Sequence, residues 1–152
     1  MPQFERLSSE ELIDLIRRGL MAGPGASLPA PEMIDVVAEL LANYGTEDFP
    51  TVMMSETAAP VEYAGVDGFR EALTDWTSPF EAFRLEIEEV IVKDDKLVFL
   101  ARQVGTTKHG GVELSTESAS VWWVRDGKVV QVVFYLDRPM GLKAAGISAP
   151  SG

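Results

Sequence analysis

The fold is decided by the stretch Ser118-Ala-Ser-Val-Trp-Trp-Val-Arg-Asp-Gly-Lys-Val-Val-Gln-Val-Val-Phe-Tyr-Leu136. Its centre, Asp126-Gly127, favours a two-residue type I′ turn, because both central positions of that turn need a positive φ. On either side lie runs of Val, Trp, Phe and Tyr, which suit a half-buried strand. The stretch therefore predicts a β-hairpin in which Arg125 pairs with Lys128.

Counting outward from this turn divides the side chains between two faces of the sheet. The first face is uniformly apolar, so other parts of the chain must cover it; it carries Ala119, Val121, Trp123, Val130, Val132, Phe134 and Leu136. The second face is mixed and suits water, a partner subunit or a polar-lined cavity; it carries Ser118, Ser120, Trp122, Val124, Val129, Gln131, Val133 and Tyr135. The hairpin alone leaves these three surroundings open.

The composition is that of an acidic globular chain. With 152 residues, of which 46% are apolar, it is long enough for one domain with a proper core. The formal net charge of −11 argues against nucleic acid, whose phosphates need Lys and Arg, and against an anionic membrane surface. Cysteine is absent and His109 is the one histidine, which excludes disulfides, thiolate sites and multi-histidine metal sites. We therefore expect no metal and no cofactor.

The N-terminus lacks the basic-then-apolar layout of a signal peptide. Elsewhere, no apolar run approaches the ~20 residues that a membrane span requires. We therefore expect a cytoplasmic protein with neither a nucleic-acid nor a membrane partner.

Hydrophobic periodicity predicts that helices precede the sheet. Apolar residues recur at helical spacing near residues 8–20, 31–44 and 68–77. Asp67 suits the N-cap of the third helix, and Asp137-Arg138-Pro139 suits the start of a short C-terminal helix. The Pro/Gly-rich stretch from Ala22 to Pro31 is typical of a loop.

Strands follow with a period of two. Phe49–Met54 and Val61–Tyr63 suit short strands, and from Phe83 onward the alternation predicts a meander of four long strands. Helices segregated from an antiparallel sheet form an α+β pattern. A long sheet roofed by helices on one face curves into a cone, which is where small apolar ligands bind.

Several segments resemble a known family. The segments are Gly65-Val-Asp-Gly-Phe-Arg70, Asp75-Trp76, Phe83–Ile91 and, as the most specific part, Ala119–Gly146. Over about residues 32–146 the chain resembles a SnoaL-like, polyketide cyclase-like protein of the nuclear transport factor 2-like superfamily. On this comparison residues 1–152 form a single domain, with residues 1–30 as a helical N-terminal extension.

The resemblance implies a cystatin-like roll: a curved, mostly antiparallel sheet, wrapped into a cone by three helices from the N-terminal half, with a short C-terminal helix. It also implies a conical pocket and a homodimer through the sheet. The first face of the hairpin would then point to the helices and the pocket. Trp122, Gln131, Val133 and Tyr135 would point outward, toward a second subunit.

Two charged residues are candidates for acid/base chemistry. Proton abstraction beside a carbonyl needs a carboxylate with a raised pKa and a donor for the developing oxyanion. A two-residue turn at Asp94-Asp95 would make Glu89 and Arg102 the only charges on an apolar face with Leu85, Ile87, Ile91, Val98, Leu100 and Val104. Buried charges are costly unless paired, so this pair is either structural or functional. A register slip of one residue would turn both toward water.

Asp137 is a further catalytic candidate, with Tyr135 as its hydrogen-bond donor. The competing interpretation, an N-cap for the last helix, is the one we favour. His109 at a Gly-Gly turn is typical of a solvated loop residue, and Glu117 is either a base or the end of the apolar face.

Large apolar side chains are expected to line the pocket or to fill a solid core in its place. The predicted ligand-binding residues are Tyr63, Phe69, Trp76, Phe80, Phe83, Leu100, Trp123 and Phe134. The resulting hypothesis is a cofactor-free cyclase or isomerase that acts on an apolar, polyketide- or steroid-like carbonyl compound. The alternative is a ligand-binding or dimerisation module without chemistry.

Overall fold

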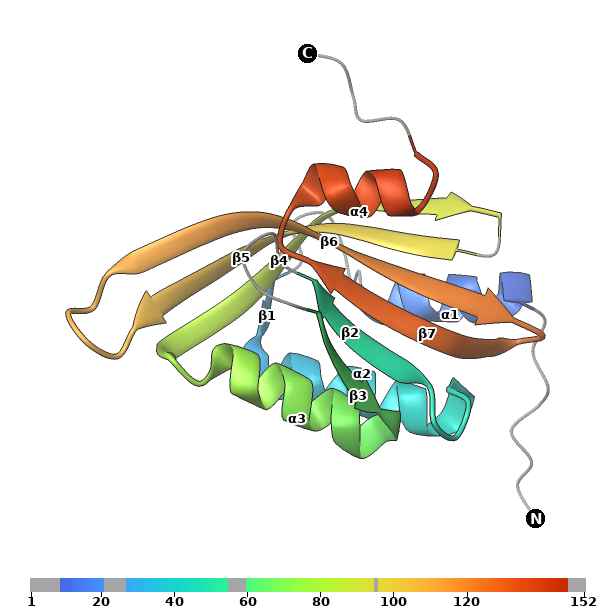
Figure 1. Ribbon diagram of the computed structural model, residues 1–152, viewed down its shortest axis with the longest axis horizontal. Helices are drawn as coiled ribbons and strands as arrows, with labels where there is room; N and C mark the ends of the chain where they lie inside the picture. Colours follow the sequence, from blue (N-terminus) through green and yellow to red (C-terminus); the bar gives the residue numbers. More distant parts are fainter. Residues whose placement is uncertain (1–8, 21–26, 55–59, 95, 148–152) are drawn as a thin grey trace.

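The computed structural model describes residues 9–20, 27–54, 60–94 and 96–147. Three helices lie on one side of a bent sheet, and a short fourth helix lies on the other (Figure 1). The helices are α1 (Ser9–Leu20), α2 (Ala30–Tyr44), α3 (Gly65–Thr77) and α4 (Arg138–Ala144). In these ranges, no helix combines the length and the apolar character that crossing a membrane requires.

The sheet is mixed but mostly antiparallel. Over the described residues it has seven strands in the order β1-β4-β5-β6-β7-β2-β3, and β2 and β7 are its parallel pair. The strands are β1 (Ser27–Pro29), β2 (Pro50–Met54), β3 (Val61–Ala64), β4 (Phe80–Lys93), β5 (Lys96–Thr107), β6 (Glu113–Arg125) and β7 (Lys128–Tyr135). The predicted α+β class, the meander of four long strands and the short C-terminal helix are therefore confirmed.

One strand lies where the composition predicts a loop. Ser27–Pro29 pairs with β4, with Leu28 opposite Leu85, so the loop prediction is wrong for these residues. A strand of three residues is too short to show a period of its own, and pairing with its neighbour makes it a strand. Residues 21–26 of the predicted loop, and Ser8 in the first predicted helix, lie outside the described residues.

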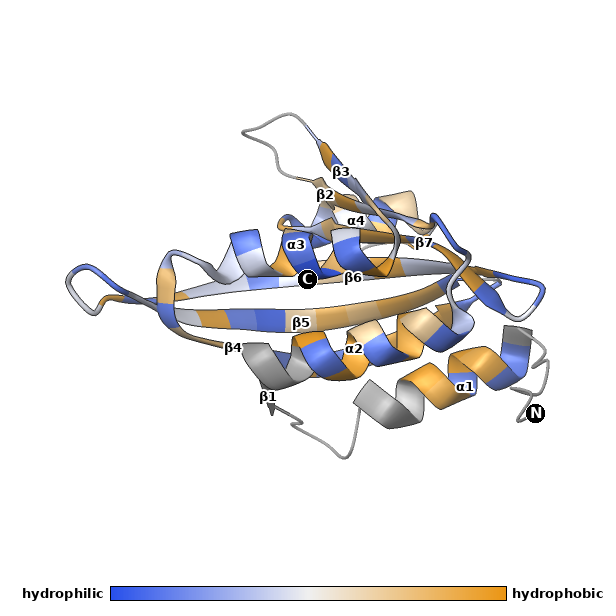
Figure 2. Ribbon diagram, turned by 90° about the horizontal axis from the view of Figure 1, so that it is seen from below, coloured by the Kyte–Doolittle hydropathy of each residue, from blue (hydrophilic) through white to orange (hydrophobic). Residues whose placement is uncertain are grey.

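The larger core lies on what we call the helix-facing side of the sheet. Helices α1 and α2 cross this side beside α3 (Figure 2). Their apolar faces pack on the strands, because helical spacing gathers those residues along one stripe. The fully buried members include Leu12, Ile16, Leu41, Phe49, Phe69, Leu97 and Val132.

A second, smaller core lies on the opposite side, which we call the α4 side. Its buried members are Val98, Leu100, Ala119, Val121, Val133, Tyr135, Leu142 and Ala145. The helix approaches closely because Gly141 has no side chain: a Cβ there would lie 2.7 Å from the Cβ of Ala119. The central strands are thus covered on both faces.

The predicted hairpin forms, but a bulge changes its faces. Asp126 has a φ of 52° and Gly127 a φ of 73°, as a type I′ turn requires, and Arg125 pairs with Lys128. The register then shifts, so that Trp123 lies opposite Gln131 and Val130 is the extra residue.

Beyond the bulge, the predicted faces are correct for β7 and wrong for β6. Val132 and Phe134 pack on the helix-facing side as expected, but Ala119 and Val121 belong to the α4 core. Trp122, predicted to point outward, is 2% exposed within the helix-side core. One residue of slip moves every later side chain of a strand to the other face.

Candidate functional site

The end of α3 lies against the helix-facing side of β5. Trp76 donates its indole Nε1–H to the side-chain Oε1 of Gln103, 3.1 Å away, in a partly buried position. Thr77 beside it donates its hydroxyl to the carbonyl of Leu73 at 2.9 Å. Trp76 and Gln103 are each half-buried, so part of both residues is accessible to solvent. This contact joins the last turn of the helix to the centre of the sheet.

Aromatic side chains lie on the same side. The rings of Phe69 on α3 and Phe134 on β7 are 6.2 Å apart, and those of Phe80 and Phe83 on β4 are 5.4 Å apart. Phe80 lies over Gly105, where a Cβ would come within 2.5 Å of the ring. Phe69 is fully buried, whereas the other three rings are half-buried.

Tyr63 lies along α3 from the neighbouring strand β3. Its hydroxyl donates to Oδ2 of Asp75 at 3.5 Å. Partial burial, and then the negative charges of Asp75 and Glu71, raise the pKa of Tyr63 above its ordinary value of 10.0. The Cβ of Tyr63 would lie 3.0 Å from a Cβ built on Gly68, so strand and helix are in close contact here.

Among the residues that the structure describes, one serine and one threonine are buried, and only one of their two hydroxyl groups has a hydrogen-bond partner. Ser118 donates its hydroxyl to the carbonyl of Ala101 at 3.2 Å. Thr51, which lies opposite Val132 on the helix-facing side, is 0% exposed and its Oγ1 has no hydrogen-bond partner in the described structure. A buried polar group without a partner is uncommon in a folded protein.

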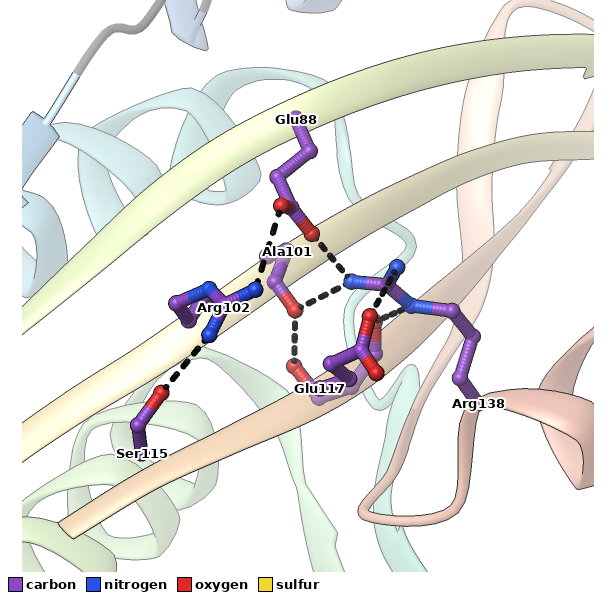
Figure 3. Close-up of polar contacts among 7 residues, drawn as sticks. Glu88, Ala101, Arg102, Ser115, Glu117 and Arg138 are labelled. Atoms are coloured by element: carbon purple, nitrogen blue, oxygen red, sulfur yellow. Dashed lines mark hydrogen bonds and ion pairs between the residues drawn. The ribbon is translucent and has the colours of Figure 1, made fainter.

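A polar cluster lies on the α4 side of the sheet (Figure 3). Arg138, the first residue of α4, donates to Oε1 of Glu88 at 2.5 Å and to Oε2 of Glu117 at 3.0 Å. The same guanidinium donates to the carbonyls of Ala101, at 2.9 Å, and Ser118, at 3.3 Å. Its side chain is only 19% exposed. Arg138 therefore ties the start of α4 to β4, β5 and β6.

Arg102 stands beside this cluster, and the pairing predicted for it is wrong. Its guanidinium donates to Oγ of Ser115 at 3.2 Å and lies 3.8 Å from Oε2 of Glu88, so its ion pair is with Glu88, whereas Glu89 lies opposite Leu100 as expected. The reason is a bulge in β4 between Ile87 and Glu89, which leaves Glu88 as the extra residue. Together Glu88, Arg102, Glu117 and Arg138 form a network of two carboxylates and two guanidinium groups.

The same bulge divides the face that was expected around Glu89. Leu85 and Ile87 pack with the helix-side core, whereas Ile91, Val98 and Leu100 pack with the α4 core. Of the predicted ligand-binding side chains, Leu100 lies on the other side of the sheet from Leu85 and Ile87 because of this bulge, and Trp123 also lies on the α4 side because of the register shift in the hairpin.

Asp137 has the structural role that we favoured. Its side chain caps α4 by accepting from the backbone N–H of Met140 at 3.5 Å. By contrast, α3 begins one turn earlier than expected: its N-cap is Ala64, and Asp67 lies in the first turn. A catalytic role for Glu89, Arg102 or Asp137 stays a prediction. Within the described residues, no group of three or more His, Asp or Glu side chains is placed to hold a metal ion.

The sequence reasoning missed Gln103, Glu88 and Arg138 as members of polar contacts, and Thr51 as a buried polar residue. Gln103 had a weak signal, because it interrupts the apolar strand Leu97-Val-Phe-Leu-Ala-Arg-Gln-Val104. Glu88 had none, since its orientation depends on a bulge.

Comparison with known proteins identifies the family. The model of the SnoaL-like domain matches residues 32–132, well over half of the chain. None of the curated proteins compared with the chain matches it.

Solved structures share the fold at low sequence identity. A candidate SnoaL-like polyketide cyclase from Jannaschia sp. is 16% identical with a TM-score of 0.63, over 99% of each chain. A nuclear transport factor 2-like protein of unknown function from Burkholderia pseudomallei is 13% identical with a TM-score of 0.62, over 91% of this chain and 98% of that one. A protein named TerC, co-crystallised with polyporic acid, is 18% identical with a TM-score of 0.57, over 76% of this chain and 90% of that one. The chain belongs to the SnoaL-like family, and it shares the fold of a nuclear transport factor 2-like protein.

Proposed function

We propose that the chain binds a small, mainly apolar molecule between the end of α3 and the helix-facing side of the sheet. The observation that carries this proposal is that Trp76, Phe83 and Phe134 are only half-buried, although helices lie on this side. Burying large aromatic side chains releases much apolar surface from water, so a ligand that covers them gains affinity.

The polar groups of this region support the same proposal. Gln103 and Ser120 are half-buried and lie among the apolar residues of β5 and β6. A site that is mostly apolar, with a few placed polar groups, is typical of small-molecule binding.

Proteins of the same fold bind small molecules. TerC was co-crystallised with polyporic acid. A protein with a ketosteroid isomerase-like fold from Catenulispora acidiphila was crystallised with trimethylamine; it is 15% identical, with a TM-score of 0.54, over 74% of this chain and 87% of that one. These ligands belong to those proteins, and they support the proposal for this chain by analogy of fold.

The three tryptophans allow a direct test by NMR. Each indole N–H gives its own proton–nitrogen signal, which the Trp76→Phe and Trp123→Phe variants assign. Titration with indane, a small apolar probe, should shift the Trp76 signal. Trp123 is the matched control, because it is also half-buried but packs on the α4 side. No shift in any indole signal, or a shift of Trp123 alone, would refute the proposed site.

A second candidate function is cofactor-free acid/base chemistry on an apolar carbonyl compound, as in a cyclase or an isomerase. The observation in its favour is that two carboxylates and two guanidinium groups meet at the start of α4. Proton abstraction can be followed as exchange of the protons beside the carbonyl of 1-indanone in heavy water. The wild-type chain should accelerate the exchange, and Glu89→Gln, Glu88→Gln or Asp137→Asn should slow it. Equal exchange with and without protein would refute this candidate.

We also propose a homodimer through the α4 side of the sheet. The surface expected for it, with Val133 and Tyr135, is covered within the chain by α4. The half-buried Ile91 and Trp123 beside α4 are the better candidates. Sedimentation should give a dimer that Trp123→Glu weakens, and a monomer at all concentrations would refute it.

A further inference from the structure

We propose that Gln103 selects ligands that carry a neutral carbonyl oxygen, and that Trp76 is the positioning residue that aims it. This inference rests on the proposed function and names the chemical class of the ligand. The observation behind it is the single hydrogen bond between the indole of Trp76 and the amide of Gln103.

That hydrogen bond fixes which way the amide points. An indole N–H can only donate, whereas a glutamine amide has one oxygen that accepts and one nitrogen that donates. Gln103 must therefore turn its Oε1 toward Trp76, as the 3.1 Å contact has it. The Nε2 group, with its two N–H donors, is turned away from the indole.

The amide nitrogen is left to bind something else. Within the part of the chain that the structure describes, Oε1 is the only side-chain atom of Gln103 with a hydrogen-bond partner. Thr116 on β6 and Leu85 on β4 lie opposite Gln103 in the two neighbouring strands. Since the residue is half-buried, a ligand on the helix-facing side can reach the two donors.

The chemistry of the donors defines the ligand. Two N–H groups recognise an acceptor oxygen, and the surrounding aromatic side chains favour an apolar body. The chain carries a formal net charge of −11, so its field repels anions and favours a neutral carbonyl over a carboxylate. The expected ligand is thus a flat or aromatic ketone, aldehyde or quinone.

The test compares two probes that differ in one group. 1-Indanone carries a carbonyl where indane has a methylene, and the dissociation constants of both are measured by the Trp76 signal or by calorimetry. The ratio of the two constants in one variant, divided by the ratio in the wild type, cancels the different hydration of the probes. Loss of one neutral hydrogen bond should weaken the binding of 1-indanone relative to that of indane about three- to tenfold.

Three variants and a control test the role of Gln103. Gln103→Met removes both the donors and the acceptor, while Gln103→Glu keeps an acceptor for Trp76 but has no donor; both should lose the preference for 1-indanone. Trp76→Phe, read by calorimetry, should lose part of the preference because the amide is free to turn. Gln131→Met is the matched control, because Gln131 is half-buried on the α4 side. This variant should leave the ratio of the two dissociation constants unchanged.

The outcomes separate the two levels of the proposal. If both probes bind near Trp76 and the ratio is the same in the wild type and in both Gln103 variants, the role of Gln103 is refuted and the proposed binding site stands. If neither probe binds, the proposed function fails, and the role of Gln103 fails with it.

Discussion

The unsatisfied hydroxyl of Thr51 gives the sharpest prediction of stability. Thr51 and Ser118 are the buried polar residues among those that the structure describes, at 0% and 4% exposure. Ser118 donates to the carbonyl of Ala101, whereas Oγ1 of Thr51 has no partner. The pair therefore allows the same chemical change, loss of one buried hydroxyl, to be made in two opposite settings.

The two changes should have opposite signs. A buried polar group without a partner costs roughly 1–3 kcal/mol, so Thr51→Val, which keeps the shape, should raise the free energy of unfolding by about 1 kcal/mol. Ser118→Ala removes a made hydrogen bond and should lower it by about 1 kcal/mol. The carbonyl of Ala101 still accepts from Arg138 at 2.9 Å, so that loss should be no larger. For a chain of this size, each change corresponds to about 3 °C in Tm.

Urea unfolding followed by circular dichroism measures both changes. The slope of unfolding free energy against urea should stay constant, because neither variant alters the surface exposed on unfolding. A Thr51→Val variant that is less stable than the wild type by 1 kcal/mol or more would contradict the reasoning. It would mean that the hydroxyl is satisfied in solution.

Three further predictions concern α4 and its contacts. Arg138→Met should lower the free energy of unfolding by about 2 kcal/mol, because it leaves two carboxylates without their shared partner. In the same denaturation assay the control Arg84→Met, which removes an exposed ion pair, should lower it by less than ~0.5 kcal/mol. Asp137→Ala should cost about 0.5–1 kcal/mol through the lost N-cap, while Asp137→Asn should cost almost nothing; equal losses in a thermal melt would refute a cap. Burial raises the pKa of Tyr135 above 10.0, so its neutral form stabilises the fold below pH 10, and that contribution is lost as the pH rises through the folded-state pKa. Tyr135→Phe should make the alkaline loss of stability shallower, and an unchanged profile would contradict this.

The elements of the fold could be predicted from local patterns. A positive φ at both positions of Asp126-Gly127 is a property of two residues, and the turn forms as expected. The cap at Asp137 is equally local, since Pro139 follows in the first turn of α4. The three-residue strand at Ser27–Pro29 could not be predicted, because its pairing partner is more than 50 positions away in the sequence.

Most of the polar contacts could not be predicted from the sequence, because they depend on the register of the strands. Glu88 and Arg138 are 50 positions apart, and nothing in either segment points to the other. The contact between Trp76 and Gln103 joins a helix to a strand 27 positions later. The size of the aromatic residues on the helix-facing side indicates burial or binding from the sequence alone, and a ligand-binding role for them stays a prediction.

The two bulges were hidden for the same physical reason, which is that the sheet is covered on both faces. In a strand with one solvent-exposed face, a bulge shifts the alternation of apolar and polar residues by one position. In β4 the apolar positions do change from 83, 85 and 87 to 90 and 92. Ile91 conceals that change, because it packs on the α4 side and makes the run Val90-Ile91-Val92 continuous. In β7 the valines before and after Gln131 do the same. The short C-terminal helix therefore both buries the second face and removes the signal by which register is read. At one of these two bulges Glu88 is the extra residue, which is why the ion-pair partner of Arg102 is Glu88 and not the expected Glu89.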